Sequence, residues 1–159
     1  MKSLVPIAEQ VAAKLIAAKQ TVAVAESSAG GLVSAALLAV PGASAYFMGG
    51  AVVYTRDARK ILMDIPNETM RGLRSSSEPY AQLLADRMRE RFAADWGLSE
   101  TGAAGPSGNS YGDAAGHSCM AVSGANRAVI TLETGRADRV ANMEAFAAAA
   151  LNLFLKTLG

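Results

Sequence analysis

The chain has 159 residues, of which 51% are hydrophobic and 18% are charged. We expect a single domain over residues 1–159, because this length supports one sizeable core. The formal net charge of +1 argues against nucleic-acid binding, and the one cysteine, Cys119, excludes an internal disulfide. We see no signal peptide and no apolar run of membrane-spanning length, so we expect a cytoplasmic protein without a membrane partner.

The first third of the chain alternates helical and strand-like patterns. Apolar residues recur at helical spacing near the N-terminus, a short β-branched run follows, and Pro41 and Gly42 end the next helix. A glycine pair inside the following strand suggests a bulge or a close backbone approach. The predicted elements are a helix over 4–19, a strand over 21–25, a helix over 32–40 and a strand over 46–55.

The rest of the chain contains helices, a long glycine-rich loop and a hairpin. Ser77 and Pro79 are typical of a helix start. The loop is too long for a simple connector, and such loops are usually functional or disordered. The early alternation predicts a sheet covered on both faces, and the late hairpin predicts that it is mixed. The predicted elements are short helices over 57–63 and 67–73, a helix over 78–94, a strand over 96–101, a loop over 102–116, hairpin strands over 117–123 and 127–134, and a helix over 137–158.

The first candidate site is the turn from Glu26 to Gly31, which follows a buried strand and opens a helix. Backbone N–H groups converge at such a turn, and they bind phosphates or stabilise an oxyanion. Gly30 and Gly31 would let the backbone approach a ligand closely. The alternative interpretation is an ordinary helix cap made by Ser27 or Ser28.

Two further segments carry possible chemistry. The run from Thr101 to Pro106 suggests a backbone cradle for a ligand, and the alternative is a plain surface loop. The run from Tyr54 to Lys60 supplies a phenol, a carboxylate and three cations near the expected ligand face, and the alternative is a charged helix start. His117 is the only histidine, and its place in a predicted strand favours a half-buried structural role. One histidine and one cysteine cannot make an ordinary zinc site, so we expect no metal and no cofactor.

Three segments resemble the C-terminal domain of the CinA competence/damage-inducible family. AESSAGG (Ala25 to Gly31) is similar to the family's AES-C-T-G-G turn, and TGAAGPSG (Thr101 to Gly108) is similar to its T-G-I-A-G-P-G-G loop. VPGASAYFMGGAVVYTRDARK (Val40 to Lys60) resembles its PGSS-A-x-F-x-x-G-x-V-x-Y-S-N-E-A-K segment. The resemblance implies a three-layer α/β/α sandwich with a mixed, mostly parallel sheet. It also implies an amidohydrolase that converts nicotinamide mononucleotide to nicotinate mononucleotide and ammonia.

The same resemblance implies a set of site residues. Ser27 matches the motif serine and would be the nucleophile, with Ser28 as the reserve candidate. Tyr54 and Thr101 match family site positions and would orient the substrate or relay a proton. Arg59 and Lys60 complete the expected catalytic set. The expected substrate-binding residues are Glu26, Ser28, Ala29, Gly30, Gly31, Gly102, Gly105 and Arg139.

This chain departs from the family pattern at the expected ligand face. The lysine expected to act as the base is replaced by Arg59, and arginine cannot accept a proton. The family threonine is Ala29 here, and the loop after Pro106 lacks the usual lysine. These departures motivate an alternative, a nucleotide-binding domain with lost or altered activity; an interaction module is a third class. We expect a small-molecule nucleotide ligand and a homodimer or higher homo-oligomer.

Overall fold

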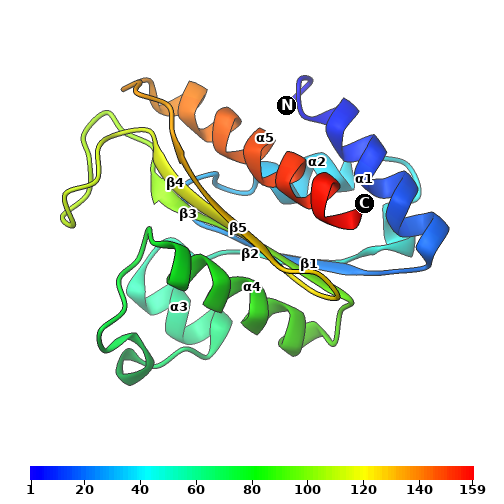
Figure 1. Ribbon diagram of the computed structural model, residues 1–159, viewed down its shortest axis with the longest axis horizontal. Coiled ribbons are helices and arrows are strands. Elements are labelled where there is room, and N and C mark those ends of the chain that lie inside the picture. Colours follow the sequence, from blue (N-terminus) through cyan, green and yellow to red (C-terminus); the bar gives the residue numbers. More distant parts are fainter.

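The computed structural model describes residues 1–159 and contains one five-stranded sheet with helices packed against it (Figure 1). In chain order the elements are α1 (Val5–Ala18), β1 (Val22–Glu26), α2 (Leu32–Leu38), a 3₁₀ turn (Ala43–Ala45), β2 (Phe47–Val52), α3 (Arg56–Met63), a 3₁₀ turn (Asn67–Met70), α4 (Glu78–Phe92), β3 (Trp96–Ala103), β4 (His117–Ser123), β5 (Ala128–Glu133) and α5 (Arg139–Leu158).

The sheet is mixed, as the sequence predicts. Its strand order is β2-β1-β3-β4-β5, with parallel pairing of β1 to β2 and to β3 and antiparallel pairing of β4 to β3 and to β5. All strands except β4 therefore point the same way. The carboxyl ends of β1, β2 and β3 meet at one edge of the sheet, which is where open α/β sheets bind ligands.

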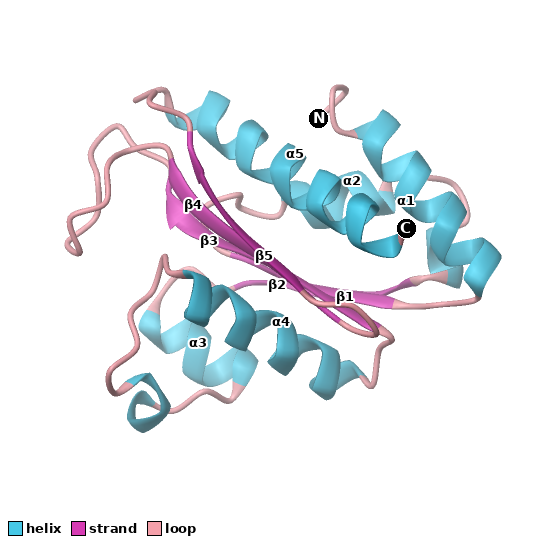
Figure 2. Cartoon of the chain, viewed as in Figure 1, coloured by secondary structure: helices cyan, strands magenta, loops and turns pink.

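The predicted three-layer arrangement is confirmed. Helices α1, α2 and α5 cover one face of the sheet, and α3 and α4 cover the other (Figure 2). The larger apolar core lies under α1, α2 and α5, where Trp96 and Phe154 meet edge to face with ring centroids 5.8 Å apart. On the other face, a Cβ on Gly97 would lie 2.0 Å from the Ala85 carbonyl oxygen. Only glycine therefore allows α4 to approach β3 this closely.

Local sequence signals set several helix starts. The side chain of Ser77 accepts the Tyr80 N–H at the start of α4, as predicted, at 3.3 Å. Thr55 caps α3 and Asp138 caps α5 in the same way. None of the helices combines the length and apolar character that crossing a membrane requires.

Some predicted boundaries are wrong. Strand β2 ends at Val52, three residues early, because the chain leaves the sheet and Thr55 turns to cap α3. The helix predicted over 67–73 is only a 3₁₀ turn, which precedes Gly72 in a left-handed conformation (φ 76°). Strand β3 continues to Ala103 because its ladder with β4 extends that far, so the glycine-rich loop is two residues shorter.

Candidate functional site

Three adjoining hollows form a cleft at the carboxyl ends of β1, β2 and β3. The central hollow has a volume of about 310 Å³, the loop hollow about 230 Å³ and the outer hollow about 360 Å³. The central hollow shares Tyr54 and Gly102 with the loop hollow and shares Arg56, Arg59, Ser75 and Tyr111 with the outer hollow. The central hollow is also lined by Ser27, Val53, Thr55, Ser76, Tyr80 and Thr101.

Two buried glutamates hold the turn after β1, and the first is Glu26. Its carboxylate accepts the N–H groups of Gly31, Val33 and Ser34 at 3.2, 2.9 and 2.8 Å. Burial raises the pKa of Glu26 above its ordinary value, although hydrogen bonds from Ser34 and Val33 oppose the shift. Glu26 thus occupies the N-terminus of α2 and acts as a cap rather than as an exposed substrate ligand.

The second glutamate, Glu100, lies in β3 with its side chain wholly buried. It accepts the backbone N–H groups of Ser27 and Ala29 at 3.1 and 2.8 Å. It also accepts the hydroxyls of Ser28 and Ser118 at 2.5 and 2.7 Å. Glu100 is not among the residues predicted from the sequence, where its only signal is a carboxylate within an otherwise buried strand.

The expected backbone cradle at Ala29 to Gly31 is not available to a ligand. The two glutamates accept the N–H groups of Ala29 and Gly31, and the Ser27 carbonyl accepts that of Gly30 at 3.1 Å. The helix-cap interpretation therefore describes this turn better, although the caps are glutamates and not serines. The assignment of these N–H groups to an oxyanion or phosphate was wrong.

The two adjacent serines have different environments. Ser28 is 4% exposed, and its hydroxyl donates to Glu100. Ser27 is half-buried and lines the central hollow, and its hydroxyl makes no hydrogen bond within the protein. Ser28 lines the loop hollow with its hydroxyl held by Glu100, whereas the Ser27 hydroxyl is free on the wall of the central hollow, so Ser27 stays the first candidate nucleophile and Ser28 the reserve.

Residues from β3 and α5 complete the wall beside Ser27. Thr101 is buried in β3, and its Oγ1 accepts the Ser76 N–H at 3.2 Å. Arg139, at the start of α5, donates to the Gly105 carbonyl at 2.5 Å and to the Tyr54 hydroxyl at 3.2 Å. Arg139 and Gly105 both line the loop hollow, so these expected site residues do come together.

Of the two neighbouring residues Arg59 and Lys60, only Arg59 lines the cleft. Arg59 is 5% exposed, lines the central and outer hollows, and lies with its guanidinium 5.9 Å from the centre of the Tyr80 ring. Lys60 is exposed and lines none of the three hollows. The expectation that Lys60 belongs to the catalytic set is corrected, because one residue along a helix turns the side chain by about 100°.

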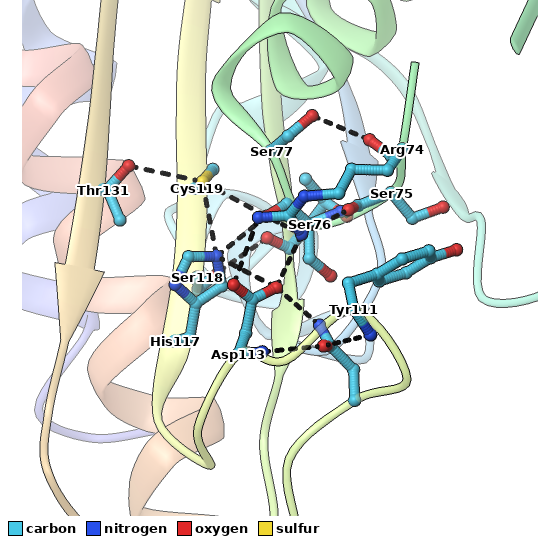
Figure 3. Close-up of polar contacts among 12 residues, drawn as sticks. Arg74, Ser75, Ser76, Ser77, Tyr111, Asp113, His117, Ser118, Cys119 and Thr131 are labelled. Carbon is cyan, nitrogen blue, oxygen red and sulfur yellow. Dashed lines mark hydrogen bonds and ion pairs between the residues drawn. The ribbon is translucent and has the colours of Figure 1, made fainter. Parts of the chain in front are cut away.

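A polar network beside the cleft joins the glycine-rich loop to the residues before α4 (Figure 3). Arg74 donates to Asp113 at 2.6 Å, and His117 Nε2 donates to the Ser76 carbonyl at 2.7 Å while Nδ1 pairs with Glu133. Burial opposes protonation of His117, but these two hydrogen bonds and the charge of Asp113 outweigh it and raise its pKa. His117 lines none of the hollows, which fits the structural role expected for it.

The cleft carries positive charge only. Four arginines line the three hollows, namely Arg56, Arg59, Arg74 and Arg139, and no Asp or Glu lines them. Only Arg74 forms an ion pair, with Asp113. Because the whole chain has a net charge of +1, this concentration of cations is a local property of the cleft.

Comparison with known proteins gives a single family. The CinA C-terminal domain model matches residues 4–158. A CinA-like protein of Synechococcus sp. (strain CC9902) is 41% identical over 107 residues, and one of Anaeromyxobacter sp. (strain K) is 40% identical over 147 residues. These matches cover 67% and 91% of this chain but 26% and 36% of those proteins, so the chain spans about a third of the length of such relatives or less.

Solved structures agree over the whole fold. The competence/damage-inducible protein CihA from Agrobacterium tumefaciens superposes with a TM-score of 0.91 at 26% identity, covering 98% of this chain and 96% of that one. A competence or damage-inducible protein from Enterobacter asburiae also gives a TM-score of 0.91 at 26% identity, with 98% of each chain covered. The chain therefore belongs to the CinA C-terminal domain family.

Proposed function

We propose that this domain is an amidohydrolase of the nicotinamide mononucleotide deamidase type, with Ser27 as its nucleophile. The observation that carries the proposal is the free Ser27 hydroxyl on the wall of the central hollow, next to a serine whose hydroxyl is already bonded to Glu100. The substrate class comes from the family resemblance of the motifs around Ser27, Tyr54 and Thr101.

The reaction follows from the position of Ser27. Its Oγ attacks the carboxamide carbon, the C–N bond breaks, and the hydroxyl proton passes through water to the departing nitrogen, which leaves as ammonia. A second water then hydrolyses the acyl ester. Nicotinate mononucleotide is released and the Ser27 hydroxyl is restored.

The other cleft residues bind and stabilise. An arginine is not a general base, but the Arg59 guanidinium can stabilise the oxyanion that forms on the attacked carbonyl. Tyr54, oriented by Arg139, and Thr101 line the surfaces against which the nucleotide would lie. Gly102 and Gly105 border the loop hollow, where Arg139 supplies a positive charge for the ligand phosphate.

A second candidate is a nucleotide-binding domain without turnover. The observation that favours it is the lining of the central hollow, which includes no His, Lys, Asp or Glu to act as a general base. Under this candidate the cleft binds the same nucleotide, and Ser27 contributes only contact surface.

Ammonia release from nicotinamide mononucleotide separates the two candidates. We expect slow release by the unmodified protein and a loss of about a hundredfold or more in Ser27→Ala. Ser75→Ala is the matched control, because Ser75 lines the same hollow and its hydroxyl also makes no hydrogen bond. Binding without release would support the second candidate, and equal rates in both serine variants would remove Ser27 as nucleophile.

A further inference from the structure

The starting observation is a buried polar atom with nothing to bond to. Arg59 Nε is the one buried side-chain nitrogen or oxygen in the protein that lacks a hydrogen-bond partner. No carboxylate forms an ion pair with Arg59, although only 5% of the residue is exposed to solvent. A buried N–H donor without an acceptor is unfavourable, and such groups in native proteins call for an explanation.

The contacts within the protein leave this charge only partly compensated. The Tyr80 ring lies 5.9 Å from the guanidinium carbon, near the outer limit for a cation–π contact. The face of an aromatic ring does not replace the carboxylate or carbonyl oxygen that Nε–H requires. The neighbouring Arg56 adds a second unpaired cation to the same wall, and no acid lines it.

The position of Arg59 connects the missing acceptor to the ligand. Arg59 and Ser27 line the same central hollow, which reaches the ends of both β1 and α3. A group that lies against Ser27 is therefore in a hollow that Arg59 also lines. Under the proposed function, that group is the carboxamide of the substrate or the carboxylate of the product.

Hydrogen-bond chemistry distinguishes these two groups. A guanidinium offers only donors, in a planar fork that matches the two acceptor oxygens of a carboxylate. A carboxamide has one acceptor oxygen, and its NH₂ group would place donors against donors. A carboxylate also neutralises the buried charge, which a neutral amide cannot do.

We propose that Arg59 makes the central hollow a carboxylate receptor, so that the domain binds the acid form of its pyridine nucleotide more tightly than the amide form. This inference rests on the proposed function for the class of nucleotide, but it does not require turnover. If the domain is catalytic, its own product is its tighter ligand and inhibits it. If it is not, nicotinate mononucleotide is the ligand it retains.

The test compares dissociation constants by titration calorimetry for nicotinate mononucleotide and nicotinamide mononucleotide. We expect the unmodified protein to prefer the acid by roughly tenfold or more, as a charge-assisted bidentate pair implies. Arg59→Gln should bring the ratio close to one. Arg56→Gln, which removes the same charge from an exposed position on the same helix, should weaken both ligands by a similar factor and keep the ratio.

Two further arms keep the result interpretable. Nicotinate and nicotinamide lack the phosphate, so a preserved preference for nicotinate places the carboxylate, and not the phosphate, at Arg59. Arg59→Lys keeps the charge but loses the fork, so its acid preference should fall below that of the unmodified protein even if Arg59→Gln does not fold. Circular dichroism melting curves check the fold of each variant.

The outcomes separate this inference from the proposed function. Acid preference without ammonia release would support the inference and contradict the deamidase. Ammonia release with equal affinities, or with tighter binding of the amide, would contradict the inference and leave the deamidase standing. The inference would be overturned if neither nicotinate mononucleotide nor nicotinate bound at millimolar concentration. It would also be overturned if Arg59→Gln kept the same preference for the acid over the amide.

Discussion

Buried polar groups are hydrogen-bonded on one wall of the cleft and left without a partner on the other. In the turn after β1, Glu26 and Glu100 accept the backbone N–H groups, and Glu100 also accepts the Ser28 hydroxyl. At the start of α3, Arg59 is buried with its Nε unpartnered. The comparison teaches that burial of a polar residue near a site does not mark function by itself. Glu26 and Glu100 are bonded within the turn, whereas Arg59 Nε has no acceptor within the protein.

The largest effect should come from Glu100. Glu100→Gln removes a buried carboxylate that accepts four hydrogen bonds, so we expect the free energy of unfolding to fall by about 3 kcal/mol or more. Urea denaturation measures the change. Glu68→Gln is the control, because Glu68 is exposed and makes no side-chain hydrogen bond. Equal urea midpoints for the two variants would contradict a structural role for Glu100.

The opposite wall should respond in the opposite direction. Arg59→Met removes an unpartnered buried charge and keeps much of the side-chain volume, so we expect the free energy of unfolding to stay the same or to rise by about 1 kcal/mol. The same urea titration measures it. A loss as large as that of Glu100→Gln would show that Arg59 supports the fold, and the comparison between the walls would fail.

The serine pair sharpens the comparison within one turn. Ser28→Ala removes a hydroxyl bonded to a buried carboxylate, so we expect a loss of about 1.5 kcal/mol of stability. Ser27→Ala removes an unpartnered hydroxyl, and its stability should change by less than about 0.5 kcal/mol. Thermal melting of the two variants checks this order, and a reversed order would contradict the assigned environments.

The smallest effect should be a pH dependence at the rim of the cleft. The pKa of His117 is raised above its ordinary value, so the folded state binds this proton more tightly than the unfolded state does. This contribution is complete below the unfolded pKa, about 6.5, and is lost as pH rises through the folded pKa. His117→Asn should therefore lose the most stability near pH 5.5 and little near pH 9, measured by urea denaturation at both values. A larger loss at high pH would contradict the raised pKa.

Sequence patterns predicted the parts of the molecule that depend on neighbouring residues. Apolar, capping and turn residues together predicted all five strands and all five α-helices, and Ser77 predicted the start of α4. The end of β2 was placed three residues late, because it depends on Thr55 leaving the sheet to cap α3. The strand-like sequence pattern continues to Thr55, but Thr55 caps α3 instead of pairing in the sheet.

The site was predicted in part, and the reason is again physical. The motifs placed Ser27, Tyr54, Arg59 and Thr101 near one another, and all four line the central hollow. They did not reveal that Glu100 accepts the N–H groups of the turn, because that contact spans about 70 residues of sequence. Nor did they place Ser75, Tyr80 and Tyr111 in the cleft, since two loops and the first turn of α4, which meet only in the folded chain, bring them there.

The role of Ser27 is tested most directly by the rate of ammonia release from nicotinamide mononucleotide by Ser27→Ala and Ser28→Ala, measured beside the unmodified protein. We expect that Ser27→Ala loses release while Ser28→Ala, at a temperature where it is folded, retains most of it. Loss of release in Ser28→Ala with retention in Ser27→Ala would contradict the central claim, because the hydroxyl held by Glu100 would then be the reactive one.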